Sequence, residues 1–283
     1  MIGGIIGDII GSVYEAHQWS SKELPLIQKL PVDKTVVIPN FKDTKWVRTN
    51  YGWTDDSLCT LGLYKAYIEK TDFAETLKDV CNRNLNDSIG FGKAFKNWLS
   101  EEVSEPYNSY ANGSIMRVGF IPFLNISLSQ KLRLGHEVTK ITHNHLNSYQ
   151  AVQDFIVLCH TLKDDFKNKN YSKDCLLTYL DNQEFDLTVE DMHEENRFEL
   201  NSLYTLCQAV SIVYESDSFE DTLRNSFYVG GDSDTLATVA GNLASVIYPI
   251  PENLMHVAEV AMATNKELYD LVVHFSENYW TKY

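Results

Sequence analysis

Residues 3–17 read GGIIGDIIGSVYEAH, an apolar run in which small and branched residues recur with helical spacing. Gly3, Gly7 and Gly11 repeat every four residues, so an α-helix places them in one smooth stripe that a second helix can approach closely. The run has no basic residue ahead of it, carries Asp8 in its middle and is too short to span a membrane. We therefore expect a buried helix of a soluble protein.

The same run carries a second stripe, which is polar. Asp8, Ser12 and Glu15 fall at positions i, i+4 and i+7, so they share one face of an otherwise apolar helix. A solvent-facing stripe is the simpler interpretation, but the remaining faces are isoleucine and glycine rather than lysine and glutamate. Buried polar side chains need partners, so Asp8 and Glu15 are candidate functional residues.

Composition limits the classes of protein to which the chain can belong. It has 283 residues, a net charge of −15 and 44% hydrophobic residues, which supports a sizeable core. We expect residues 1–283 to form a single domain. A surface so acidic repels phosphate backbones, which disfavours broad nucleic-acid binding, but its carboxylates can bind metal. The five cysteines form no CxxC pair, as expected of reduced cysteines in a cytoplasmic protein.

Helical periodicity extends over most of the chain, whereas alternating strand patterns are scarce. Spacings of three and four residues predict helices near residues 58–68, 72–85, 131–141, 149–162, 203–213, 219–227, 235–247, 251–263 and 266–275. The best candidate for a short strand is TVVIP at residues 35–39. The charge-mixed run MHEENRFE at residues 192–199 is interpreted as solvated surface.

Two segments place carboxylates and a threonine at the start of a predicted helix. The first contains Thr54, Asp55 and Asp56, and the second, GGDSDT at residues 230–235, contains Asp232, Asp234 and Thr235. Either segment alone is explained as a helix cap, because acidic residues are favoured in a first turn. Four carboxylates brought together would instead repel one another unless cations neutralised them. Oxygen donors of this kind suit Mg²⁺ or Mn²⁺, and four acids suffice for two ions.

Two further segments are candidates for ligand binding. Asn112, Gly113 and Ser114 form a small-residue turn that we expect to open an apolar helix, whose N–H groups can bind a diphosphate; an ordinary turn is the alternative. Arg117 follows in an apolar context and needs an anionic partner, either an acid or the ligand. His143 lies in a polar turn, where substrate contact and simple loop packing are both open.

Five motifs in this order resemble the ADP-ribosylglycohydrolase family, which includes dinitrogenase-reductase-activating glycohydrolase and the ADP-ribosyl-acceptor hydrolases. They are GDIIGSVYE at residues 7–15, WTDDS at 53–57, NGSIMR at 112–117, THNH at 142–145 and GGDSDT at 230–235. The resemblance covers nearly the whole chain. It implies an all-α, single-domain orthogonal helical bundle with a site for two Mg²⁺ or Mn²⁺ ions.

The resemblance also implies roles for individual residues. The implied metal ligands are Thr54, Asp55, Asp56, Asp232, Asp234 and Thr235, and the implied substrate-binding residues are Asn112, Gly113, Ser114, Met116 and His143. Glu15 is the first candidate for the catalytic acid or base, and Asp56 and Asp232 come second. Ala111 stands where a glycine is common, and residues 146–150 depart from the usual continuation of the family, which bears on the ADP-ribose contacts.

The implied reaction is hydrolysis of the bond at ribose C1 in ADP-ribosylated protein side chains or small ADP-ribose conjugates, with release of ADP-ribose. We expect a cytoplasmic monomer that binds neither membranes nor a nucleic-acid scaffold. Two alternatives come from other classes: a non-catalytic ADP-ribose-binding or structural relative, and a metal-dependent phosphohydrolase of nucleotide diphosphates.

Overall fold

The computed structural model describes residues 1–20, 52–85, 89–102, 105–168 and 172–280, with the side chains of all of these except 13 and 15–20. The strand predicted at residues 35–39 and the side chain of Glu15 therefore lie outside the described part. Within it, extended backbone pairs only at one isolated antiparallel bridge, between Ala111 and Asn201. The all-α class expected from the sequence is confirmed.

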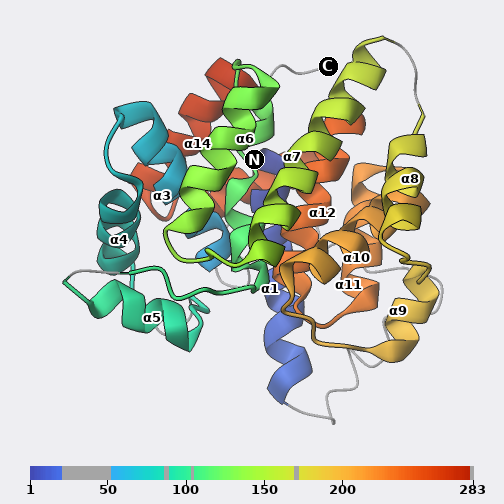
Figure 1. The fold of residues 1–283 in the computed structure, drawn as a ribbon, viewed down its shortest axis with the longest axis horizontal. Coiled ribbons are helices and arrows are strands. Elements are labelled where there is room, and N and C mark those ends of the chain that lie inside the picture. The colour runs from blue at the N-terminus through green and yellow to red at the C-terminus, as the bar shows by residue number, and fades with distance from the viewer. Residues whose placement is uncertain (21–51, 86–88, 103–104, 169–171, 281–283) are drawn as a thin grey trace.

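The α-helices follow one another along the chain and pack around a continuous apolar core (Figure 1). They are α1 (Ile2–Ser20), α3 (Asp55–Glu69), α4 (Phe73–Arg83), α5 (Lys93–Ser100), α6 (Leu128–Lys140), α7 (Leu146–Lys167), α8 (Asp174–Asn182), α9 (Val189–Glu195), α10 (Ser202–Glu215), α11 (Phe219–Val229), α12 (Ser233–Ile247), α13 (Glu252–Met262) and α14 (Lys266–Tyr279). Every helix predicted from periodicity is present, whereas the short helices α5, α8 and α9 were not predicted. None of the helices in the described ranges is long and apolar enough to cross a membrane.

The first part of helix α1 is buried among the other helices, its C-terminal end projects beyond them, and α12 is its main neighbour (Figure 1). The two backbones meet along the predicted glycine stripe. A Cβ atom on Gly3 or Gly7 would overlap the carbonyl oxygen of Gly241 or Ala237, respectively, and one on Gly11 would lie 2.7 Å from the Asp234 Cα. The stripe therefore lets α12 approach α1 as expected from the sequence, and it places the first turn of α12 beside the middle of α1.

Residues 112–123 differ from the apolar α-helix expected there. They form three short 3₁₀ helices, η1 (Asn112–Ser114), η2 (Met116–Val118) and η3 (Ile121–Phe123). Pro122 lacks an N–H and disfavours helical backbone before it. Carbonyl oxygens that an α-helix would use internally accept from distant groups instead. These pairs are Met116 O with Thr60 Oγ1 at 3.2 Å, Gly119 O with the Met1 amine at 2.8 Å, and Pro122 O with Lys131 Nζ at 2.6 Å.

Candidate active site

The first turn of α3 is bound to the middle of α1 through one carboxylate. Asp8 is fully buried; its Oδ2 accepts from the backbone N–H of Thr54 and of Ser57, each at 3.0 Å. Its Oδ1 accepts from Thr54 Oγ1 at 2.6 Å. Thr54 is the N-cap of α3, and its hydroxyl in turn accepts from Asp56 N–H at 3.4 Å. The polar stripe predicted on the first helix thus faces the TDD segment.

The two carboxylate segments predicted to meet do meet. Asp8, Asp56 and Asp234 each offer an oxygen, and these oxygens lie within 4.8 Å of one another. All three side chains are buried, and Thr235 Oγ1 donates to Asp56 Oδ2 at 3.2 Å. The sequence made Asp8 a functional candidate, but Asp8 was absent from the predicted metal ligands. Its position on the polar stripe of the first helix could have indicated that it belongs to the carboxylate cluster.

Burial makes this cluster unfavourable without a cation. The pKa of Asp8 is raised to about 6, first by burial and then by the charge of Asp234. The pKa of Asp56 is also raised well above its usual range, again by burial and then by Asp234. Asp56 Oδ1 is buried and has no hydrogen-bond partner within the described residues. A buried acceptor of this kind loses free energy unless it binds a donor or a cation.

The donor set fits the metals that the family resemblance implies. Every atom of the cluster is a carboxylate oxygen, with threonine hydroxyls adjacent, and hard cations such as Mg²⁺ and Mn²⁺ prefer such donors. Asp55 and Asp232 lie outside the tight cluster of three, but both line the same cavity beside it. That cavity has a volume of about 360 Å³, and Asp56, Asp234 and Thr235 form part of its wall.

The residues predicted to contact substrate fall into two groups. Asn112, Gly113, Met116 and His143 line the same cavity as the carboxylates. Ser114 does not: it is fully buried, and its hydroxyl donates to the Ala111 carbonyl at 3.1 Å.

Asn112 also contacts the carboxylate wall directly. Its Nδ2 donates to Asp232 Oδ2 at 2.6 Å, so this side chain holds one of the predicted metal ligands in position. Its backbone N–H donates to the Leu200 carbonyl at 2.7 Å, beside the bridge between Ala111 and Asn201.

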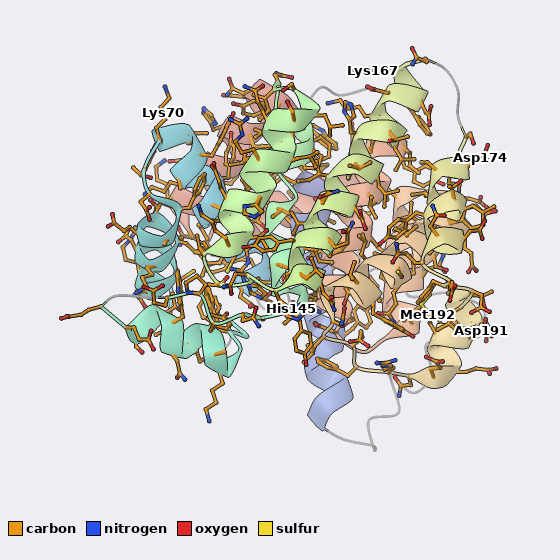
Figure 2. All side chains as sticks on the ribbon, in the orientation of Figure 1. Lys70, His145, Lys167, Asp174, Asp191 and Met192 are labelled. Carbon is orange, nitrogen blue, oxygen red and sulfur yellow. The ribbon has the colours of Figure 1, made fainter. Side chains whose placement is uncertain are left out.

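The segment after α9 forms part of the cavity wall, so the interpretation of residues 192–199 as solvated surface holds for the exposed residues 194–197 but not for the whole run. Met192, labelled in Figure 2, is buried at 1% exposure, and Phe198 and Leu200 line the cavity. Glu199 is also buried, and its carboxylate has partners there. Its Oε1 accepts from the N–H groups of Leu200 and Asn201, and its Oε2 pairs with Arg197 at 2.7 Å. The charge-mixed pattern concealed these inward-facing residues.

His143 and His145 have different surroundings. His143 is buried; its Nδ1 lies 2.7 Å from Thr142 Oγ1, and burial followed by the charge of Arg117 lowers its pKa well below the usual range. His143 is therefore neutral at physiological pH. His145, labelled in Figure 2, is the N-cap of α7, and its Nδ1 accepts from Asn147 N–H at 3.1 Å.

The fold and the site together define a class of protein. It is an all-α protein with a buried carboxylate cluster at the point where α1 meets the starts of α3 and α12. A sequence model of the family ADP-ribosylglycohydrolase matches residues 1–278. The chain belongs to this family.

Individual relatives agree with the assignment. The chain is similar to ADP-ribosylhydrolase ARH3 of Mus musculus, with 23% identity over 89% of this chain and 84% of that protein. The Homo sapiens protein of the same name is 24% identical over 89% of this chain and 86% of its own length. A solved structure titled "ADP-ribosylglycohydrolase-related protein complex" aligns with a TM-score of 0.60 and 18% identity over 98% of both chains, which shows the same fold.

Proposed function

We propose that this protein is a metal-dependent hydrolase that cleaves the bond at ribose C1 in ADP-ribosylated side chains or ADP-ribose conjugates and releases ADP-ribose. One observation carries the proposal: three buried carboxylates, Asp8, Asp56 and Asp234, have oxygens within 4.8 Å of one another, and two of them, Asp56 and Asp234, line a cavity. Family membership supplies the reaction class.

In the proposed site, Thr54, Asp55, Asp56, Asp232, Asp234 and Thr235 would hold two Mg²⁺ or Mn²⁺ ions. When bound, such ions orient hydroxyl groups and lower the pKa of a water molecule. The chain itself supplies the frame for this chemistry. Asp8 fixes the first turn of α3 through its three accepted hydrogen bonds, and Asn112 fixes the Asp232 carboxylate.

Proton movement is assigned to carboxylates. Cleavage at C1 passes through a transition state with oxocarbenium character, and one carboxylate must take a proton from water or give one to the leaving group. Glu15 is the first candidate and follows the buried part of α1, while Asp56 and Asp232 are the second candidates. We further propose that residues 1–283 form one domain, supported by the single apolar cluster that joins α1 to α14.

The test is an assay of the purified protein with Mg²⁺ or Mn²⁺ on ADP-ribosylated arginine, ADP-ribosylated serine and O-acetyl-ADP-ribose. We expect release of ADP-ribose from at least one of them. Asp55→Ala and Asp232→Ala should each lower turnover roughly 100- to 10,000-fold, whereas Asp181→Asn, on the exposed end of α8, should not. AMP as the product would identify a phosphohydrolase instead. No product from any of the three substrates would contradict the enzymatic role.

A further inference from the structure

Glu199 is a buried carboxylate in the segment that connects α9 to α10. Residues 197–201 of this segment lie outside the helices, and Glu199 is only 8% exposed. Its Oε1 accepts from the backbone N–H groups of Leu200 at 2.8 Å and of Asn201 at 2.6 Å. In a helix or a sheet such N–H groups bond to backbone carbonyls, whereas here one carboxylate oxygen accepts from both. Glu199 therefore fixes the backbone of its own segment.

The same segment holds Asn112, which in turn holds Asp232. The backbone N–H of Asn112 donates to the Leu200 carbonyl at 2.7 Å. Its side-chain Nδ2 donates to Asp232 Oδ2 at 2.6 Å and also lies 3.4 Å from the Glu199 carbonyl oxygen. Both carbonyls belong to the segment whose backbone the Glu199 carboxylate fixes. Asn112 thus connects this segment to a carboxylate in the cavity wall.

The segment also lies against the backbone next to Asp232. Gly231 has a φ of +68°, and a Cβ atom there would lie 2.5 Å from the Arg197 carbonyl oxygen. Glycine is required on both counts, because other residues rarely adopt this φ and because a side chain has no space here. Residues 197–201 therefore contact Asp232 through Asn112 and also contact the backbone immediately before it.

We propose that Glu199, which does not itself line the cavity, is a positioning residue for Asp232. Its carboxylate fixes residues 197–201, and this segment sets the position of the Asp232 carboxylate through Asn112. The consequence for metal binding rests on the proposed function, in which Asp232 is a metal ligand. The alternative role of Glu199 is the ion pair that its Oε2 forms with Arg197 at 2.7 Å. That ion pair needs the negative charge, whereas positioning needs only the acceptor oxygen Oε1.

Two variants of Glu199 separate these roles. Glu199→Ala removes both the acceptor and the charge, whereas Glu199→Gln removes the charge and keeps an acceptor oxygen. Glu215→Ala is the matched control. The Glu215 carboxylate also accepts from a backbone N–H, that of Val189 at 2.8 Å, and neither of these residues lines the cavity.

Hydrogen–deuterium exchange of the metal-free full chain tests the link to Asn112. In Glu199→Ala, the Asn112 N–H should exchange at least about tenfold faster than in the wild type, because its acceptor carbonyl is no longer held in place. Glu199→Gln and Glu215→Ala should keep the wild-type rate at this N–H. Faster exchange confined to Leu200 and Asn201 would show that the carboxylate acts only on its own segment, and would overturn the inference.

A Mg²⁺ titration by calorimetry tests whether the effect reaches Asp232. Glu199→Ala should weaken Mg²⁺ binding about tenfold, as groups that orient metal ligands do, whereas Glu199→Gln and Glu215→Ala should stay within about twofold of the wild type. In an Asn112→Ala background, which lacks the link, Glu199→Ala should cause a further loss of less than about threefold. An equal loss in both backgrounds, an equal loss in the Ala and Gln variants, or no loss in Glu199→Ala overturns the inference. Should Glu199→Ala fail to melt cooperatively, Glu199→Leu takes its place, because it fills the same space without an acceptor.

Release of ADP-ribose is measured separately on the same preparations. A wild type that releases ADP-ribose, with unchanged Mg²⁺ affinity and unchanged Asn112 exchange in Glu199→Ala, retains the proposed function and refutes the inference. A wild type without release, whose Glu199→Ala variant shows faster Asn112 exchange and weaker Mg²⁺ binding, supports the inference and refutes the catalytic proposal. A wild type that binds no Mg²⁺ refutes the proposed metal site, and the exchange rates then decide the positioning role.

Discussion

Asp8 shows how one side chain can serve both the fold and the site. Its two oxygens accept three hydrogen bonds from the first turn of α3, and it also belongs to the cluster of carboxylates with Asp56 and Asp234. The hydrogen bonds need an acceptor oxygen at this position, whereas a metal ion needs the negative charge. A substitution that removes only the charge should therefore affect metal binding, and one that also removes the acceptor should affect stability as well.

We predict that Asp8→Ala lowers the free energy of unfolding by at least about 1–3 kcal/mol, because the N–H groups of Thr54 and Ser57 become buried without acceptors. Asp8→Asn keeps an acceptor for both N–H groups and should cost less. Both should weaken Mg²⁺ binding. Urea unfolding of the metal-free variants tests the first statement and Mg²⁺ titration the second; equal stability of the Ala and Asn variants would contradict the assigned hydrogen bonds.

At the scale of the element, the contact between α1 and α12 depends on an absence of side chains. Gly3, Gly7 and Gly11 on α1 meet the backbone of α12 directly. In an exposed helix, alanine in place of glycine stabilises by roughly 0.5–1 kcal/mol. Here the added methyl group has no space, so steric overlap outweighs helix propensity.

Gly7→Ala should therefore destabilise the protein by about 1–3 kcal/mol, since the new Cβ overlaps the Ala237 carbonyl and the helices must separate. Gly52→Ala is the control: an added Cβ at this exposed position has nothing within 4 Å, and the residue is not a helix cap, so we expect a change below about 0.5 kcal/mol. Thermal unfolding compares the two. A stabilising effect at Gly7 would mean that the helices are further apart than described.

At the scale of the whole molecule, stability should depend on metal and on pH together. The folded metal-free protein holds the Asp8 proton up to about pH 6, whereas an unfolded aspartate ionises near its ordinary pKa of 3.8. Because the folded state binds this proton more tightly than the unfolded state, protonated Asp8 favours folding. This contribution is fully present below pH 3.8 and is lost as the pH rises through about 6. A bound cation favours the ionised carboxylates and should offset this loss.

We predict that chelator-treated protein loses stability between pH 4 and 7 and that Mg²⁺ restores it most at the upper end. The Asp8 contribution to this loss is at most about 3 kcal/mol. Melting temperatures with and without Mg²⁺ across this range measure the effect, and Asp8→Asn should reduce the slope. Melting curves that respond equally to Mg²⁺ at pH 4 and pH 7 would contradict the prediction.

A second pH effect comes from the surface. Glu267 on α14 pairs with Arg83 on α4 and Lys65 on α3, each at 2.6 Å, and hydrogen bonding to Arg83 is the main reason why its pKa falls to about 2. Because the folded state favours the ionised form of Glu267, this carboxylate stabilises the folded protein above its ordinary pKa of 4.5. The contribution is lost as the pH falls through about 2.

Glu267→Gln should lower stability at pH 7 by about 0.5–1 kcal/mol, a small value because the three side chains remain partly exposed. The difference from the wild type should shrink in high salt and as the pH falls from 4.5 towards 2. Glu277→Gln, on the exposed face of the same helix, serves as control and should match the wild type under all of these conditions.

The features of the fold and site that could be predicted from the sequence depend on residues close together in the chain. The glycine stripe follows from a spacing of four residues, and the TDD and GGDSDT segments could be matched because each places acids at a helix start. Their meeting also needed the family resemblance, since no local rule brings together segments about 176 residues apart, the interval from Thr54 to Gly230.

The features that the sequence did not reveal depend on distant partners. Residues 112–123 carry an apolar pattern, but their carbonyls are taken by Thr60, the Met1 amine and Lys131. The place of Phe198 in the cavity wall follows from the pairing of Ala111 with Asn201, which joins two irregular segments. No periodicity reports such a pairing.

The bare contact between α1 and α12 also restricts how this chain can change in length. One residue inserted between Gly3 and Gly11 would turn the rest of α1 by about 100° and advance it by about 1.5 Å. The turn would carry Asp8 away from Thr54 and place an isoleucine against the α12 backbone. Insertions and deletions should therefore be tolerated in loops such as the one between α8 and α9, but not between Gly3 and Gly11, where helix pitch sets the position of the carboxylate.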